Sequence, residues 1–221
     1  YYKNLFDREA GLMRPKDSKG NWRTPFDKLV ISHESTSGGD YTEGNAWQYT
    51  WHVQHEPDSL INMLGGEDAF ITKLDSLFIL KEVVHNEGFS SDVTGLIGQY
   101  AHGNEPSHHV AYLYRMAGKP SKTEELVNYI CKTKYLDRVD GLCGQMSAWY
   151  VFSAMGFYPV NPCGGEYILG APQLPRITIE LGNNKRFVVE TVNYSLENIH
   201  VRKIELNGKE LTGNSISHKD I

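Results

Sequence analysis

The chain has 221 residues and 40% of them are hydrophobic, which is enough to bury a core and excludes intrinsic disorder. Its 22 Lys and Arg against 27 Asp and Glu give a formal net charge of −5, so it lacks the cations of a dedicated nucleic-acid binder. The sequence contains no apolar run of membrane-spanning length, and its three cysteines are too few for a disulfide framework.

The chain begins with a loop and continues with helices. Residues 1 to about 45 are rich in Gly, Asp, Ser, Pro and Lys without a sustained period, which predicts a long ordered loop that wraps a site. The hydrophobic pattern then becomes helical. Helices are predicted over residues 47–64, 68–85, 94–100, 106–117, 121–132 and 145–155. The last has apolar residues on nearly every side, so we expect it to be buried all round.

After Gly156 the pattern alternates, which predicts antiparallel strands over residues 176–181, 186–192 and 199–206 and around Leu211. Asn207-Gly208 is the strongest hairpin signal, because both residues tolerate the positive φ angles of a tight turn. The sequence therefore predicts a mainly α protein with an antiparallel β part at its C-terminal end.

The first candidate site is the window from Asp40 to Glu56, which combines aromatic side chains with carboxylates. Glu43 precedes a Gly-Asn pair that opens a helix, and Trp47 and Trp51 are expected one turn apart on one face. A carboxylic acid among aromatic rings can serve as a general acid, and such rings suit the C–H faces of sugars. The alternative is that Glu43 only complements the helix N-terminus and that the tryptophans are core residues.

The second window runs from Gly98 to His109. Asn104 and Glu105 carry the amide and carboxylate oxygens that Ca²⁺ prefers. Zinc is disfavoured, because the histidines lack a helical pairing and no cysteine is near. A purely hydrogen-bonded turn is the alternative.

In the third window, residues 139–149, Asp140 stands in a glycine-bearing loop ahead of a helix, where it could orient a water molecule. The alternative is an exposed loop aspartate without a catalytic role.

Three ordered strings together carry a resemblance to a known family. They are Glu43-Gly44-Asn45-Ala46-Trp47-Gln48-Tyr49, His102-Gly103-Asn104-Glu105-Pro106-Ser107-His108-His109, and the run from Gly144-Gln145-Met146-Ser147-Ala148-Trp149 to Val160. They closely resemble family 92 of the glycoside hydrolases, which are calcium-dependent, exo-acting α-mannosidases. The segments 22–27 and 92–100 extend the resemblance over nearly the whole chain.

The resemblance implies an N-terminal β-sandwich followed by an (α/α)₆ barrel and a return of strands. On this basis residues 1–156 are expected to be the C-terminal half of the barrel, and residues 157–221 the C-terminal β-strand region. The sandwich and the first half of the barrel would lie outside this chain, as would any leader, and secretion or a periplasmic location is expected.

The resemblance also implies roles for individual residues. Glu43 matches the acid of an inverting mechanism, and Asn104 and Glu105 match a segment that holds Ca²⁺. Substrate-binding roles are implied for four further side chains: Trp47, Gln48, His102 and His108. The expected substrate is a glycan with terminal α-linked mannose, with α-1,2 linkage implied by the resemblance alone.

One departure from the family concerns the base. Related sequences carry an acidic stretch directly before the Cys-Gly-Gln-Met-Ser-Ala-Trp string, whereas here Leu142 adjoins Cys143. Asp140 is the nearest carboxylate, and we align Asp140-Gly141-Leu142 with the residues that precede the acidic stretch. Two alternatives to a mannosidase fragment remain: a carbohydrate-binding or degenerate module without a base, and a half-domain that forms homo-oligomers through its exposed barrel face.

Overall fold

The computed structural model describes residues 1–31, 39–81, 85–86, 93–135, 143–182 and 184–221. Packing divides the chain into two compact units, Tyr1–His108 and His109–Ile221. The predicted boundary at residue 156 refers to parts of a larger enzyme rather than to packing within this chain, and it stays a prediction. Among the helices that the structure describes, none is long and apolar enough to cross a lipid bilayer.

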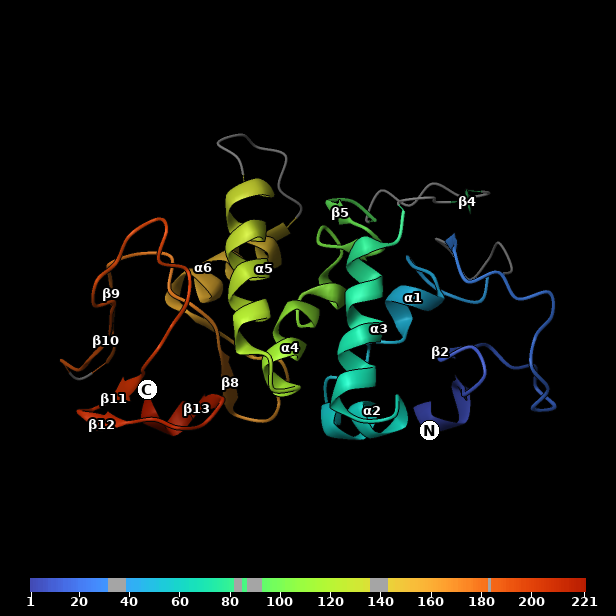
Figure 1. The fold of residues 1–221 in the computed structure, drawn as a ribbon, viewed down its shortest axis with the longest axis horizontal. Helices are drawn as coiled ribbons and strands as arrows, with labels where there is room; N and C mark the ends of the chain where they lie inside the picture. Colours follow the sequence, from blue (N-terminus) through green and yellow to red (C-terminus); the bar gives the residue numbers. More distant parts are fainter. Residues whose placement is uncertain (32–38, 82–84, 87–92, 136–142, 183) are drawn as a thin grey trace. The chain divides into compact units, whose positions relative to one another are not determined.

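The first unit combines helices with two-stranded sheets (Figure 1). Its helical elements are η1 Tyr2–Leu5, α1 Ala46–Tyr49, α2 Pro57–Met63, α3 Glu67–Ile79 and η3 Glu105–Ser107. Its strands are β1 Phe6–Asp7, β2 Leu12–Met13, β3 Val30–Ile31, β4 His85–Asn86, β5 Leu96–Ile97 and β6 Tyr100–Ala101. β3 pairs with β4 in parallel, and the pairs β1–β2 and β5–β6 are antiparallel.

The long helix α3 provides the core of this unit. It buries Phe70, Leu74 and Leu77 along one side, as the predicted amphipathic pattern requires. The Trp51 ring meets Phe70 edge to face at 5.4 Å between centroids. The predicted helix over residues 68–85 is confirmed up to Ile79 and ends there, because Leu80 has an extended backbone.

Two predicted helices in the first unit are wrong in part or in whole. The span 47–64 is divided between α1 and α2, because Pro57 starts a new helix and cannot lie inside one. The span 94–100 is the hairpin β5–β6 rather than a helix. Gly95 and Gly98 have φ angles of +63° and +61°, and a Cβ on Gly98 would lie 2.5 Å from the Leu77 carbonyl oxygen. Only glycine fits this turn.

The second unit pairs helices with small antiparallel sheets (Figure 1). The helical elements are η4 Val110–Tyr112, α4 Leu113–Met116, α5 Pro120–Thr133, α6 Cys143–Met155 and η5 His218–Asp220. The strands are β7 Phe157–Tyr158, β8 Glu166–Leu169, β9 Arg176–Glu180, β10 Arg186–Glu190, β11 Glu205–Leu206, β12 Lys209–Glu210 and β13 Ser215–Ser217. The sheets have the orders β13-β8-β7, β10-β9 and β11-β12.

The helix predictions in this unit are largely confirmed, with two corrections. The helices over residues 121–132 and 145–155 are present as α5 and α6, whereas the span 106–117 forms the short elements η3, η4 and α4 instead of one helix. α6 is not buried all round, because Tyr150 is 37% and Val151 55% exposed.

The strand predictions at 176–181 and 186–192 are confirmed as β9 and β10, and the turn at Asn207-Gly208 joins β11 to β12 with φ angles of +51° and +76°. The predicted strand 199–206 is reduced to its last two residues, and the triple β7, β8 and β13 was not expected. The strands pack on a cluster of Met155, Phe157, Leu169 and Ile216, so the β part shares a core with the end of α6. The described structure is thus helical with an antiparallel β part, and the half-barrel stays a prediction.

Candidate active site

Glu43 lies where the N-terminal loop meets α1. Its backbone is left-handed, with a φ of +53°, and its side chain is partly exposed. Asn45 caps α1: its Oδ1 accepts from the Gln48 N–H at 3.1 Å, and Gln48 Oε1 accepts from the Asn45 N–H at 2.9 Å. This reciprocal capping box fixes the direction in which the chain leaves Glu43.

Gly44 is buried in this junction, and the space there explains why a glycine follows the acid. A Cβ on Gly44 would lie 2.9 Å from Oε1 of Gln48 and 3.1 Å from Cε2 of Tyr49. Contacts this short force a neighbour to move. The motif therefore encodes close packing around Glu43, which sequence spacing alone did not reveal.

The amides of the first motif bind the second motif. Asn45 Nδ2 donates to Gln99 Oε1 at 2.9 Å, and Gln48 Nε2 donates to the Gln99 carbonyl oxygen at 3.1 Å. Gln48 was expected to bind substrate, and the structure places both ends of its amide in contacts within the protein. Its substrate-binding role stays a prediction. Gln99 was missed, because no sequence signal relates residues 54 positions apart.

Asn104 connects the turn at 102–109 to the acid. Its Nδ2 donates a hydrogen bond of 2.8 Å to the carbonyl oxygen of Glu43. The residue is only 5% exposed, and its Oδ1 is buried and accepts no hydrogen bond from the residues that the structure describes. A buried amide oxygen without a donor is costly unless a cation or water satisfies it. The structure therefore brings Glu43 and Asn104 together and leaves Oδ1 of Asn104 available to bind a cation or water.

The two predicted histidines, His102 and His108, belong to the turn at residues 102–109. His102 is fully buried, and its Nδ1 lies 2.8 Å from the Tyr100 hydroxyl. His108 Nε2 lies 2.9 Å from the His102 carbonyl oxygen. A carbonyl only accepts, so His108 carries its proton on Nε2. Burial lowers the pKa of His108, which keeps this imidazole neutral. Their substrate-binding roles stay predictions.

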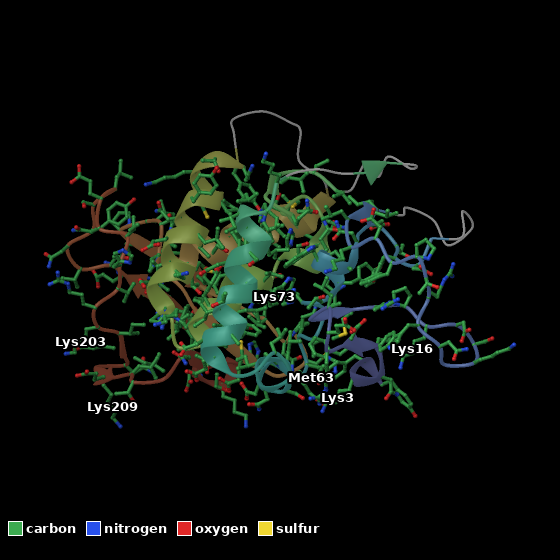
Figure 2. All side chains as sticks on the ribbon, turned by 45° about the vertical axis from the view of Figure 1, so that its right-hand side comes forward. Lys3, Lys16, Met63, Lys73, Lys203 and Lys209 are labelled. Atoms are coloured by element: carbon green, nitrogen blue, oxygen red, sulfur yellow. The ribbon has the colours of Figure 1, made fainter. Side chains whose placement is uncertain are left out.

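The two tryptophans of the first motif have different surroundings. Trp51 is fully buried in the core, as the structural alternative expected for it, whereas Trp47 is partly exposed. Nζ of Lys73 lies 4.1 Å from the centroid of the Trp47 ring, a cation–π geometry. Lys73 projects from α3 (Figure 2), and burial lowers its pKa to about 8. The sequence did not predict that Lys73 lies beside Trp47. This contact restrains Trp47, the partly exposed tryptophan of the motif.

The donor set around the turn suits a hard cation. The Asn104 amide oxygen and the partly exposed carboxylate of Glu105 are adjacent in the chain, and Ca²⁺ takes such oxygens together with backbone carbonyls. In the part of the chain that the structure describes, no group of three or more His, Cys, Asp or Glu side chains is arranged to hold a metal. Asp140 lies outside the described residues.

Comparison with known proteins places the chain among the glycoside hydrolases. A model of the glycosyl hydrolase family 92 catalytic domain matches residues 1–221. The chain belongs to this family.

Its relatives are longer proteins. The chain is 39% identical to a family 92 α-mannosidase from Bacteroides thetaiotaomicron, solved in complex with mannoimidazole, with a TM-score of 0.90 over 100% of this chain and 30% of that one. It is 38% identical to a family 92 inverting mannosidase from the same organism, with a TM-score of 0.84 over 100% of this chain and 31% of that one. An uncharacterized secreted glycosidase from Arthroderma benhamiae is 28% identical over 95% of this chain and 27% of its own length. The chain thus spans less than a third of these relatives.

Proposed function

We propose that the longer protein containing this chain is a Ca²⁺-dependent exo-α-mannosidase that inverts the anomeric centre. The hydrogen bond from Asn104 to the Glu43 carbonyl oxygen carries this proposal, because it places the proposed acid next to the proposed cation ligand. Family membership and two relatives named as mannosidases support the substrate class. α-1,2 linkage and secretion are part of the proposal, and a relative named as secreted supports the location.

In this proposal Glu43 is the general acid. It donates its proton to the glycosidic oxygen as the bond to the anomeric carbon breaks. A carboxylate base on the opposite face of the sugar takes a proton from the attacking water, and inverting enzymes hold the two carboxyl groups roughly 6.5–9.5 Å apart to admit that water. Asp140 is the proposed base, because it is the carboxylate nearest in sequence to the position where relatives carry the acidic stretch. Trp47, Gln48, His102 and His108 are the proposed sugar-binding side chains.

Asn104 and Glu105 are the residues that we propose to hold Ca²⁺. The buried Oδ1 of Asn104 fits this role, because it has no hydrogen-bond donor among the described residues. The side-chain amide to which it belongs is also held in place by the hydrogen bond to Glu43. When bound, Ca²⁺ supplies contacts for two mannose hydroxyls and favours a distorted ring. Proton transfer remains with the carboxyl groups of the chain.

The acid role is tested by leaving-group dependence in the longer protein. Glu43→Gln should reduce turnover of an α-mannobiose far more than that of a dinitrophenyl α-mannoside, because a poor leaving group needs protonation most. Glu9→Gln, at an exposed position, is the matched control and should leave both rates unchanged. Equal losses on both substrates in Glu43→Gln would count against Glu43 as the acid.

The cation is tested by chelation. Activity should disappear in excess chelator and return with Ca²⁺ more completely than with Mg²⁺, whose small octahedral shell suits a loop of amide and carboxylate oxygens badly. Full activity in excess chelator would exclude the metal from the mechanism.

One observation favours a second candidate, a binding module without a base: Leu142 adjoins Cys143 where relatives carry an acidic stretch. Sequencing the purified longer protein across Leu142 and Cys143 establishes whether those carboxylates exist. A module of this kind would bind an α-mannobiose without hydrolysing either substrate. In our proposal the rest of the barrel covers the exposed side chains of Tyr150 and Val151 on α6. If light scattering showed that this chain forms a homo-oligomer, the alternative of a half-domain that covers this face with a second copy would be favoured instead.

A further inference from the structure

The side chain of Tyr49 holds the backbone immediately before Glu43. Its hydroxyl accepts a hydrogen bond of 2.9 Å from the Thr42 N–H and donates one of 2.6 Å to the Thr42 carbonyl oxygen. One hydroxyl therefore engages both backbone groups of the residue that precedes the acid. Thr42 lies in the loop before Asn45, the N-cap of α1, so these bonds tie the helix to the loop that carries the acid.

The ring of Tyr49 also contacts the residue after the acid. Its Cε2 and Cδ2 would lie 3.1 and 3.2 Å from a Cβ on Gly44, so the ring packs closely against that glycine. Glu43 stands between two residues that the same side chain touches. Its φ of +53° is uncommon for a residue with a side chain and persists only where the surroundings impose it.

Tyr49 is itself fixed by its neighbours. Its ring lies 5.0 Å from that of Tyr41 and 4.7 Å from that of His52, measured between centroids. The Tyr41 hydroxyl donates to the Met13 carbonyl oxygen at 2.7 Å, which attaches this aromatic group to β2. Because its neighbours restrain the ring, Tyr49 can in turn restrain the loop to which its hydroxyl is bonded.

We propose that Tyr49 is a positioning residue for Glu43, acting on the acid through its backbone. The inference rests on the proposed function of Glu43. A general acid must keep its proton within hydrogen-bond reach of the glycosidic oxygen, and a change in the φ angle of Glu43 swings the whole side chain. Asn104 holds the carbonyl on the far side of Glu43, so Tyr49 supplies the restraint on the near side.

Tyr49→Phe in the longer protein removes both hydrogen bonds and keeps the ring. We expect kcat for an α-mannobiose to fall on the order of ten- to a hundredfold, the scale of one or two hydrogen bonds. The rate for a dinitrophenyl α-mannoside should change less than threefold, because that leaving group departs without a proton. Deuterium uptake in the peptide containing Thr42 should become faster.

Tyr194→Phe is the matched control. Tyr194 also donates one bond to a backbone carbonyl oxygen, that of Gln173 at 2.8 Å, and it belongs to the second unit. The control should change neither the ratio of the two rates nor deuterium uptake at Thr42. A general loss of folding would lower both rates of a variant together, which separates a structural role from a positioning role.

Glu43→Gln, assayed in parallel, separates failure of this inference from failure of the proposed function. If Glu43→Gln is selective for the disaccharide and Tyr49→Phe leaves both rates unchanged or lowers them equally, the positioning role is wrong and the acid assignment stands. If Glu43→Gln itself shows no selectivity, the proposed function fails, and with it the inference.

Discussion

The side-chain amide of Asn104 joins the two motifs at the candidate site. Its nitrogen donates a 2.8 Å hydrogen bond to the carbonyl oxygen of Glu43, and its oxygen is buried without a donor among the described residues. Because Nδ2 and Oδ1 belong to one rigid planar group, a ligand that binds the oxygen also orients the bond to Glu43. In our proposal, cation binding and placement of the acid therefore depend on the same side chain.

Asn104→Asp separates these two functions. The substitution keeps an oxygen that can bind Ca²⁺ but removes the N–H group that donates to Glu43. We expect Ca²⁺ affinity, measured by calorimetry on the longer protein, to be kept or increased by the added charge. Turnover of an α-mannobiose should fall on the order of tenfold or more. The substitution removes one hydrogen bond, and it also places a carboxylate oxygen against the carbonyl oxygen of Glu43.

Asn104→Ala is the comparison, because it removes both amide atoms. It should weaken Ca²⁺ binding as well as turnover. If Asn104→Asp abolished Ca²⁺ binding, or if Asn104→Ala left it unchanged, Asn104 would not be a ligand.

Gly44→Ala should disturb the same junction by crowding. The added methyl group would meet Gln48 Oε1 at 2.9 Å and the Tyr49 ring at 3.1 Å, and overpacking of this kind costs about 1–3 kcal/mol. The free energy of unfolding in urea and the rate on an α-mannobiose should both decrease. Gly213→Ala is the control, because its nearest neighbour would lie 3.9 Å away. Equal effects of the two substitutions would show that the space at Gly44 is unimportant.

The sequence predicted the long, strongly periodic elements and failed where glycine or proline decides the backbone. α3 and α5 follow from hydrophobic periodicity, α6 from a continuous apolar segment, and the turn at Asn207-Gly208 from turn chemistry. The segment 94–100 reads as a helix from its apolar residues, but the positive φ angles of Gly95 and Gly98 make it a hairpin. Glycine adopts φ angles of either sign, so its presence alone does not predict the positive angles, which become visible only in the structure.

At the candidate site, the sequence selected candidate residues but did not predict the bonds between them. Glu43 and Asn104 were selected as separate candidates, and their contact spans 61 positions of the chain. Tyr49 and Gln99 stand inside the recognised strings without an assigned role, because each acts by binding a distant backbone or amide group. Contacts of this kind depend on tertiary packing, which the spacing of residue types does not encode.

The second unit contains a buried ion pair whose removal should be costly. Arg115 and Glu124 are 6% and 2% exposed, and their nearest N and O atoms are 3.1 Å apart. Glu124→Ala leaves the Arg115 charge buried without its partner, so we expect a loss of about 3–5 kcal/mol in the free energy of unfolding in urea.

The exposed pair Arg186 and Glu180 is the control for this prediction. Its side chains are both 66% exposed at a separation of 2.9 Å, so Glu180→Ala should cost at most about 1 kcal/mol. Replacing Arg115 and Glu124 together by Met and Leu should recover most of the stability lost in Glu124→Ala. A loss for Glu124→Ala as small as that for Glu180→Ala would mean that the buried pair does not stabilise the fold.

His52 should make stability depend on pH. Burial lowers its pKa from 6.5 to about 4, so between these values the unfolded chain binds a proton that the folded chain does not. The free energy of unfolding should therefore decrease as the pH falls from about 6.5 to about 4, by at most about 1.4 kcal/mol per pH unit for this group. Buried His108, whose pKa is also lowered, acts in the same direction.

Urea unfolding at pH 7 and pH 5 measures the difference in the free energy of unfolding. His52→Gln should reduce this difference, whereas His55→Gln, at an exposed position, should not. An unchanged pH dependence in His52→Gln would show that the imidazole can be protonated in the folded protein.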